Sequence, residues 1–578
     1  MVSTTESTPA LRSDQIFAAL DRAQADGTTI IFEGDTSDYF VAGDTFTRLP
    51  YLVALWAARY GIPTCTYTMA EGTKHLVAPG GPRPGVKEAK PDLQAGPALD
   101  VTGLLKAIVA GKQPTVLILD FAESMLPSQT DGTGRSLGES ILVEQVLSQA
   151  VDPRLGWVEG YHKLILISRT GDLQSCITQM PGVKRHSLGL PSLSEREAAI
   201  AMMLESVRHR LVLEPDLDRT TVARLSGGMS LDAMSRLRYI SSATHPLTRR
   251  GIIAEKSATI RKLAGSTLTV FDEDRNMDDV AGLPQIHLYL QDMHVCGRTT
   301  IRVILAGPPG NGKTLVALAI AQLLGVPAVA LNQIKDMWVG SSEKALSKAL
   351  EVINSMAPVL VIADEFDQTM GGSRASSSSM ESSTVESSLR AMFMEFTGDN
   401  AVDNGISIVG MSNNPQGIDA AFMSRFKTIA VLEPSSPREM VDVVLKNIAK
   451  VGAEVDTKGL EKAFSESCER FSGRELVNLL MAAQIHAARA GKSKVGRVEM
   501  KQAIRESQHY STRREQYQAL SAVAFTHSSR YLPWNAGVLL GYETVPPPGY
   551  LQEYVRGDGT LDMEGLSAAI EGGGGGFS

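Results

Sequence analysis

The residues with the clearest chemistry form a glycine-rich loop at 307–314, with the sequence GPPGNGKT. The loop fits the pattern G-x-x-x-x-G-K-[ST], follows an apolar run and precedes a helical pattern. Glycines let backbone N–H groups close around phosphate oxygens, and the N-terminus of the next helix favours negative charge. Lys313 would reach the β- and γ-phosphates, and the Thr314 hydroxyl would ligate Mg²⁺. The residues predicted to bind the phosphate-bearing ligand are Gly307, Pro308, Pro309, Gly310, Asn311, Gly312, Lys313, Thr314 and Leu315.

Further polar groups end two apolar runs downstream of this loop. Asp364 and Glu365 follow 359–363, and Asn413 follows 406–412. A carboxylate at a strand end can hold Mg²⁺, directly or through water, and its neighbour can act as general base on the attacking water. We assign these roles to Asp364 and Glu365, although an acid pair can also end a strand and face solvent. The Asn413 amide could hydrogen-bond the γ-phosphate or the water, although Asn-Pro is also a common turn start.

The elements that must position these groups alternate between apolar runs and helical patterns. We predict strands at 301–306, 327–331, 359–363 and 406–410, with helices at 313–324 and 342–356. The strands lack polar alternation, as expected where both faces of a sheet are covered, so the fold class is α/β with a parallel sheet between helices. From 437 to 507 the chain shows only an apolar period near 3.6, which predicts a separate small helical domain.

The composition fits a soluble chain of several domains. Its 578 residues correspond to roughly four compact units. The net charge of −8 argues against a nucleic-acid coat, which normally has a basic excess. The four cysteines lie far apart without a CxxC pair, so we expect neither a disulfide framework nor a zinc module. No secretory signal is visible, and no apolar run approaches the roughly 20 residues that cross a bilayer. We expect a cytoplasmic protein without a membrane partner.

Residues 278–507 resemble the AAA+ ATPases and, within them, the classical AAA clade. The segment 279–283 resembles the stretch before the glycine-rich loop in that clade, which implies that Gly282 lies against an adenine ring. Asn413 matches the sensor-1 position of the family. The resemblance implies a P-loop NTPase sheet with a helical lid, and ATP with Mg²⁺ as its ligands.

Two arginines carry the resemblance further. The segment 471–475 resembles the sensor-2 turn of the helical lid, which implies that Arg474 reaches the bound nucleotide. The segment 422–426 resembles the arginine-finger segment, which implies that Arg425 contacts the γ-phosphate held by a neighbouring subunit. Clade members often carry two arginines in a longer finger segment, and here only Arg425 is in place. One finger is chemically sufficient to offset developing charge.

A loop that would grip substrate follows the second predicted strand of this region. In classical AAA proteins an aromatic–aliphatic–glycine loop there lines the central pore of a hexamer and holds extended polypeptide. Residues 335–340 resemble it, with Met337, Trp338 and Val339 as the gripping residues. Trp338 could instead be a core residue. The serine-rich run at 371–379 resembles the second pore loop in position, although a flexible linker is the simpler interpretation.

The first half of the chain repeats this order in weakened form. An apolar run at 28–34 ends in a glycine, but no lysine or second glycine follows. The run 114–120 ends in Asp120 with its second acid displaced to Glu123, and 163–169 falls where a sensor-1 strand would lie. We predict a degenerate AAA+-like module without phosphate binding, with an unrelated α/β domain as the alternative. The arrangement resembles the poorly characterised tandem AAA proteins of cyanobacteria and chloroplasts.

The predicted organisation has five parts. They are an N-terminal segment at 1–26, the degenerate module at 27–265 (sheet 27–188, lid 189–265), an active large subdomain at 266–433, its helical lid at 434–510, and a C-terminal tail at 511–578 whose glycine-rich end is disordered.

The predicted function is that of an ATP-hydrolysing protein-remodelling motor, an unfoldase or disassembly machine. It would act on polypeptide as a homo-oligomeric ring, expected to be a hexamer. One alternative is a nucleotide-gated scaffold or switch in which the first module holds partners. Another is a nucleic-acid-directed AAA+ factor, which the net charge and the apolar character of 337–339 disfavour. The sequence contains no H-E-x-x-H motif, so we expect no attached zinc protease of that type.

Overall fold

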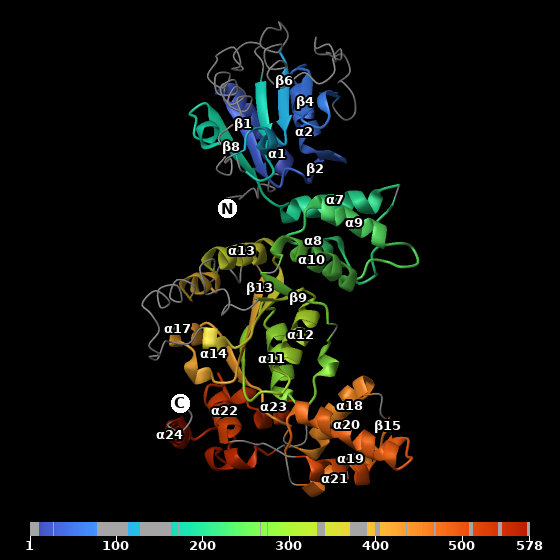
Figure 1. Cartoon of the computed structure of the whole chain (residues 1–578), viewed down its shortest axis with the longest axis vertical. Helices are drawn as coiled ribbons and strands as arrows, with labels where there is room; N and C mark the ends of the chain where they lie inside the picture. The colour runs from blue at the N-terminus through green and yellow to red at the C-terminus, as the bar shows by residue number, and fades with distance from the viewer. Residues whose placement is uncertain are drawn as a thin grey trace, which may run out of the picture. The chain divides into compact units, whose positions relative to one another are not determined.

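A computed structural model gives the fold of most of the chain (Figure 1). It describes residues 11–26, 28–77, 114–127, 163–171, 173–207, 209–265, 267–273, 275–331, 342–369, 390–398, 405–434, 436–451, 454–467, 470–507, 513–541 and 546–574. Contacts divide the chain into two compact units, Met1–Ile252 and Ile253–Ser578. The division falls inside α10 (Arg249–Ala264), somewhat before the expected boundary at 265, because Ile260 and Ala264 pack into a core of the second unit.

The first unit is built on a six-stranded sheet. In sheet order its strands are β8 (Val183–Leu188), β1 (Thr29–Gly34), β7 (Lys163–Ile167), β6 (Val116–Asp120), β4 (Thr64–Thr68) and β5 (Gly72–Leu76). All neighbouring strands pair in parallel except β4 and β5. The chain reaches α2 (Leu49–Ala58) from β1 through a hairpin, β2 (Tyr39–Ala42) and β3 (Thr45–Arg48).

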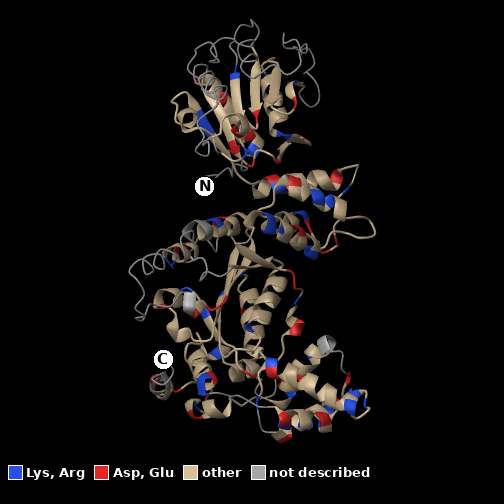
Figure 2. Cartoon of the chain, viewed as in Figure 1, with Lys and Arg blue, Asp and Glu red and all other residues tan. Residues whose placement is uncertain are grey.

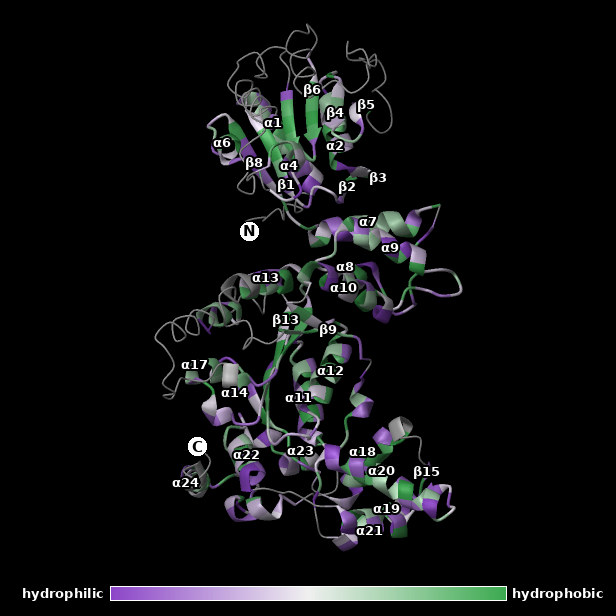
Figure 3. Ribbon diagram, viewed as in Figure 1, coloured by the Kyte–Doolittle hydropathy of each residue, from purple (hydrophilic) through white to green (hydrophobic). Residues whose placement is uncertain are grey.

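Apolar side chains cover both faces of this sheet. Because successive strand residues point to opposite faces, Ile30 and Phe32 pack against α1 (Arg12–Ala25) and α2, whereas Ile31 packs on the other face with α4 (Ala122–Met125) and α6 (Ser175–Thr178). Figure 3 shows the hydrophobic character of β1 and β6. A helical part with its own core follows, with α7 (Leu193–Glu205), α8 (Arg219–Leu225) and α9 (Leu231–Ile240).

The second unit contains another six-stranded sheet. In sheet order its strands are β14 (Lys427–Ala430), β10 (Arg302–Ala306), β13 (Ile406–Ser412), β12 (Val359–Ala363), β11 (Ala328–Leu331) and β9 (Leu268–Phe271). Only β9 is antiparallel to its neighbour. Helices α11 (Pro284–Val295) and α12 (Lys313–Leu324) cover one face, and α13 (Ser342–Ser355) covers the other (Figure 1). The predicted α/β class with two such sheets is confirmed.

A helical lid follows the second sheet. Its helices are α18 (Pro437–Val451), α19 (Thr457–Ser467), α20 (Gly473–Arg489) and α21 (Arg497–Glu506). They enclose a core of their own, which includes Phe464 and Phe471. Acidic and basic side chains are interspersed on the surfaces of these helices (Figure 2), for example where Arg497 and Lys501 both pair with Glu466.

The C-terminal segment packs on the second sheet. Its main helices are α22 (Arg513–Ala524), α23 (Pro533–Leu539) and α24 (Met563–Gly574). Leu532 and Trp534 bury against Ala430 of the edge strand β14, and the His527 N–H donates to the Thr428 carbonyl at 2.9 Å. The segment therefore covers a sheet edge that would otherwise be open. Helix α24 extends to Gly574, into the glycine run that the sequence analysis expects to be disordered.

No helix in the described ranges is both long enough and apolar enough to span a bilayer.

Candidate active site

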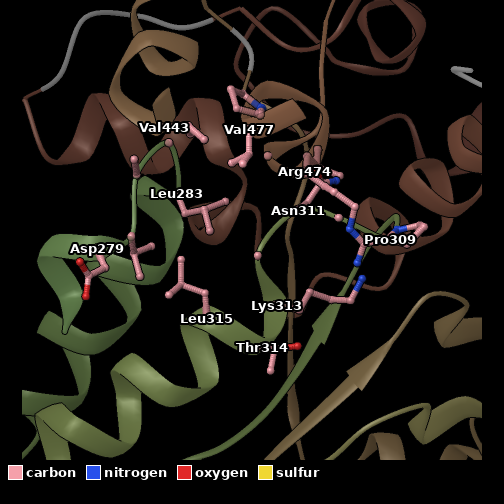
Figure 4. Close-up of a pocket in the computed structure, with 18 of the residues that line it drawn as sticks. Asp279, Leu283, Pro309, Asn311, Lys313, Thr314, Leu315, Val443, Arg474 and Val477 are labelled. Carbon is pink, nitrogen blue, oxygen red and sulfur yellow. The ribbon is translucent and has the colours of Figure 1, made fainter. Parts of the chain in front are cut away.

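A cavity of about 410 Å³ opens between the second sheet and its lid. Such a volume lies in the range of small-molecule sites. Figure 4 shows Leu283 and Leu315 on one side of the cavity, with Lys313 and Arg474 on the other. The cavity thus has a mostly apolar half, which also includes Asp279, and a polar half. The predicted site residues in its wall are Gly282, Pro309, Gly310, Asn311, Gly312, Lys313, Thr314, Leu315, Asp364, Asn413 and Arg474.

The glycine-rich loop owes its path to its glycines. Gly307 has a φ of +151°, and a Cβ there would lie 2.1 Å from the Val431 carbonyl oxygen, so no other residue fits without a shift. Gly310 and Gly312 take φ of +87° and +84°, which is the left-handed region that favours glycine. Gly312 is the N-cap of α12, which begins at Lys313. The loop therefore ends on a helix N-terminus that favours an anion.

Lys313 lies at the centre of the site. Its Nζ donates to the carbonyl oxygens of Gly307 and Pro308 at 2.7 and 2.9 Å and to Asn413 Oδ1 at 2.8 Å. Burial lowers the pKa of Lys313 to about 8, although the carboxylates of Asp364 and Asp367 act against this shift. The fold thus brings together the loop lysine and the strand-end amide, which are 100 residues apart in the chain. Gly307 and Pro308 contribute these carbonyls from outside the cavity wall.

The acid pair takes an uncommon backbone path. Asp364 lines the cavity, and its Oδ1 accepts the Glu365 N–H at 2.8 Å. Glu365 has a φ of +48°, which is rare outside glycine and tends to occur at functional sites. Its side chain is exposed beside the cavity rather than in its wall.

Asp367 is a site residue that the sequence analysis missed. It follows the acid pair on α14 (Phe366–Thr369), accepts a hydrogen bond from Ser412, and accepts the backbone N–H of Asn413. Burial, the largest cause, raises the pKa of Asp367. The available signal was an acid three residues after Asp364, in the first turn after the strand.

The lid closes the apolar half of the cavity. Val443 of α18 and Val477 of α20 line it, and both were missed because a helical apolar period equally predicts core positions. Arg474 lies in the wall, and its backbone N–H donates to the Gly310 carbonyl at 3.1 Å. Ser472 caps α20 in a capping box with Glu475, which fixes this turn beside the loop.

The remaining predicted residues lie elsewhere. Arg425 is exposed after α17 (Ala420–Met423), outside the cavity wall of its own chain. Its guanidinium donates to the Met394 carbonyl and, at 3.2 Å, to Thr397 Oγ1. Met337, Trp338 and Val339 lie outside the described residues, as does the serine-rich run.

Comparison with known proteins identifies the region that carries this site. Residues 303–434 match the model of the family described as ATPase family associated with various cellular activities (AAA). An ATP-dependent zinc metalloprotease FtsH of Symbiobacterium thermophilum is 30% identical over 259 residues, covering 43% of each chain. The corresponding protein of Pirellula staleyi is 29% identical over 290 residues, covering 48% of this chain and 40% of its own. The chloroplastic FTSH 6 of Oryza sativa subsp. japonica is 29% identical over 233 residues, covering 38% of this chain and 34% of its own.

The chain thus spans about two fifths of the length of these relatives. In the described ranges, no three or more His, Cys, Asp or Glu side chains gather in a way that could hold a metal ion. The family match ends where the lid begins, and it includes the lysine, the acid pair and Asn413. Residues 303–434 form an AAA ATPase domain of the classical, FtsH-like type.

Proposed function

We propose that this chain is an ATP-hydrolysing motor that remodels proteins as a ring of identical subunits. The observation that carries the proposal is the juxtaposition of Lys313, Asp364 and Asn413 around a cavity with one mostly apolar and one polar half. AAA domains in general bind ATP with Mg²⁺ and oligomerise.

The residues of the cavity fit ATP and Mg²⁺. Leu283, Leu315 and Val477 offer apolar surface to an adenine ring. The glycine-rich loop follows a path that a Cβ on Gly307 would not allow, and it leads into a helix N-terminus. Such a loop and helix N-terminus favour the binding of a polyphosphate. Thr314 and Asp364 would hold Mg²⁺, which supplies positive charge to the transferring phosphate group.

The chain's own residues would divide the work of hydrolysis. Glu365 would take a proton from the attacking water, and Asn413 would orient that water. Lys313 and Arg474 would hold the phosphates from two sides. Arg425, which lies outside the wall of its own cavity, would complete the site of a neighbouring copy.

Two observations support a polypeptide as the substrate. Residues 337–339 have the aromatic and aliphatic character that can grip an extended peptide without reading its sequence. The matched relatives are named as ATP-dependent proteases, which implies a polypeptide in their reactions. Zinc-dependent proteolysis forms no part of the proposal, because the sequence contains no H-E-x-x-H motif.

The ATPase rate of three variants tests this proposal. Glu365→Gln should lower turnover by about 100-fold or more, because the general base is lost. Glu351→Gln, an exposed acid on α13, is the matched control and should leave the rate unchanged. Unfolded protein should stimulate the wild type, and Trp338→Ala should lose that stimulation. Stimulation by DNA instead, or indifference to Trp338, would contradict the motor, and an active Glu365→Gln variant would contradict the catalytic assignment.

A further inference from the structure

The two sheets of the molecule can be matched residue by residue through their registers. Gly34 at the end of β1 pairs with Leu188, and a Cβ on Gly34 would lie 2.6 Å from the Leu188 carbonyl oxygen. Gly307 after β10 meets the Val431 carbonyl in the same way at 2.1 Å. Strands β8 and β14 are equivalent, because each is a parallel edge strand and pairs with the strand that leads into the glycine. Gly34 therefore occupies the position of Gly307.

The same matching places the strand-end residues. Asp120 pairs with Ile167 across β6 and β7, and Ala363 pairs with Gly410 across β12 and β13. One step further along β12, Asp364 comes level with Met411. Asn413 is two residues beyond Met411, just as Arg169 is two residues beyond Ile167. Asp120 thus matches Asp364, and Arg169 matches Asn413.

Phe121 takes the place of the catalytic glutamate. Its φ is +59°, and its N–H donates to Asp120 Oδ1 at 3.0 Å. Glu365 has the same backbone path, with a φ of +48° and the same hydrogen bond at 2.8 Å. Glu123, the second acid after this strand, accepts the Arg169 N–H at 3.3 Å. No carboxylate therefore stands at the general-base position of this sheet.

Arg169, at the position of Asn413, places a cation at the strand ends of this sheet. Its Nη1 pairs with Asp120 Oδ1 at 2.9 Å, and its Nε donates to Ser37 Oγ at 2.9 Å. Its guanidinium lies over the Phe121 ring at 3.3 Å from the centroid. One cation of the chain itself thus ties the loop after Gly34 to the Asp120 strand end.

A buried group, the carboxylate of Asp38, lies at the N-terminus of helix α9. Asp38 has no exposed side-chain surface, and it accepts the N–H groups of Leu231 and Asp232 at 2.9 and 2.7 Å. These donors form the N-terminus of α9. Arg12 pairs with Asp38 at 2.7 Å and with Glu195 of α7 at 2.9 Å. A helix N-terminus and an arginine around one anion is the arrangement that a phosphate would otherwise receive.

We infer that the first unit is closed by its own side chains, with Asp38 in place of a nucleotide phosphate and Arg169 paired with Asp120 at the strand ends, and that it binds no nucleotide. The chain therefore binds nucleotide through the second unit alone. This inference does not depend on hydrolysis or on a polypeptide substrate.

Equilibrium binding of ATPγS to the full chain tests the stoichiometry. The wild type should bind at most one molecule per chain, and Lys313→Ala should bind none at concentrations that saturate the wild type. A Lys313→Ala chain that still binds ATPγS, or a wild type that binds two, would overturn the inference. A wild type that binds no ATPγS would contradict the proposed function. Hydrogen exchange of the Asp38→Asn variant would then decide whether the first unit is closed by its own side chains.

Hydrogen exchange of the full chain tests the role of Asp38. Asp38→Asn should raise the exchange of the first-turn amides of α9 by about tenfold or more, because their charged acceptor is lost. Asp44→Asn, an exposed acid of the hairpin turn between β2 and β3, is the matched control and should leave α9 unchanged. Saturating ATPγS should not restore protection to α9 in Asp38→Asn. Restored protection, or unchanged exchange in that variant, would overturn the inference.

Discussion

The two sheets of this chain share the order of their five parallel strands and differ in what lies at the ends of those strands. In the second unit, Lys313 and Asp364 line a cavity of about 410 Å³ beneath the lid. In the first, Arg169 pairs with Asp120, and Asp38 is buried against α9. The comparison teaches that apolar strands build a common scaffold, while a few loop residues decide whether its edge binds a ligand or binds the rest of the chain.

The largest loss of stability is expected from substitution of the two equivalent glycines, Gly34 and Gly307. Gly34→Ala should destabilise the first unit and Gly307→Ala the second, each by about 3 kcal/mol, because the new Cβ meets a backbone carbonyl and φ is positive. Hydrogen exchange of the strand amides in each unit measures this.

Gly189→Ala is the control, since a Cβ there meets nothing within 4 Å. The equivalence of the two positions would fail if Gly34→Ala were as mild as this control.

A smaller effect is expected from the carboxyl group of Asp35 in the first unit. Burial, followed by the nearby Asp38 carboxylate, raises the pKa of Asp35 to about 6 from an ordinary value of 3.8. The folded chain therefore binds a proton more tightly than the unfolded chain, so this group's stabilising contribution is complete below pH 3.8 and is lost as pH rises through 6. Asp35→Asn should stabilise the first unit by about 1 kcal/mol at pH 7, allowing for the partial exposure of Asp35.

The stability of the first unit against urea, measured at pH 7 and pH 4, checks this prediction. The gain from Asp35→Asn should shrink at the lower pH, where the wild-type carboxyl is largely protonated. A gain that is equal at both values would contradict the titration of Asp35 as its cause.

Much of the second unit could be predicted because its signals are local. The strands before Gly307 and Asp364 are unbroken apolar runs, and the loop motif has a fixed spacing. Asn413 is expected to hydrogen-bond the γ-phosphate or the attacking water, a role that stays a prediction. Its contact with Lys313 Nζ at 2.8 Å was not predicted from the sequence.

Other features depend on distances that spacing does not specify. Phe121 could not be matched to Glu365 from the sequence, because the match rests on a shared left-handed backbone and on strand register. Asp38 could not be assigned to the α9 N-terminus because the two lie 193 residues apart. The packing of the C-terminal segment on β14 could not be predicted either, because the spacing of its apolar residues does not specify the surface that they cover.

The most direct test of the account changes the matched aspartates one at a time and measures ATP turnover by the full chain. Asp364→Asn should lower turnover by about 100-fold or more, because the predicted Mg²⁺ ligand is weakened. Asp120→Asn, the same change at the equivalent position of the first sheet, should leave turnover within about twofold. Equal losses in the two variants, or a loss confined to Asp120→Asn, would contradict the claim that the second unit alone carries the chemistry.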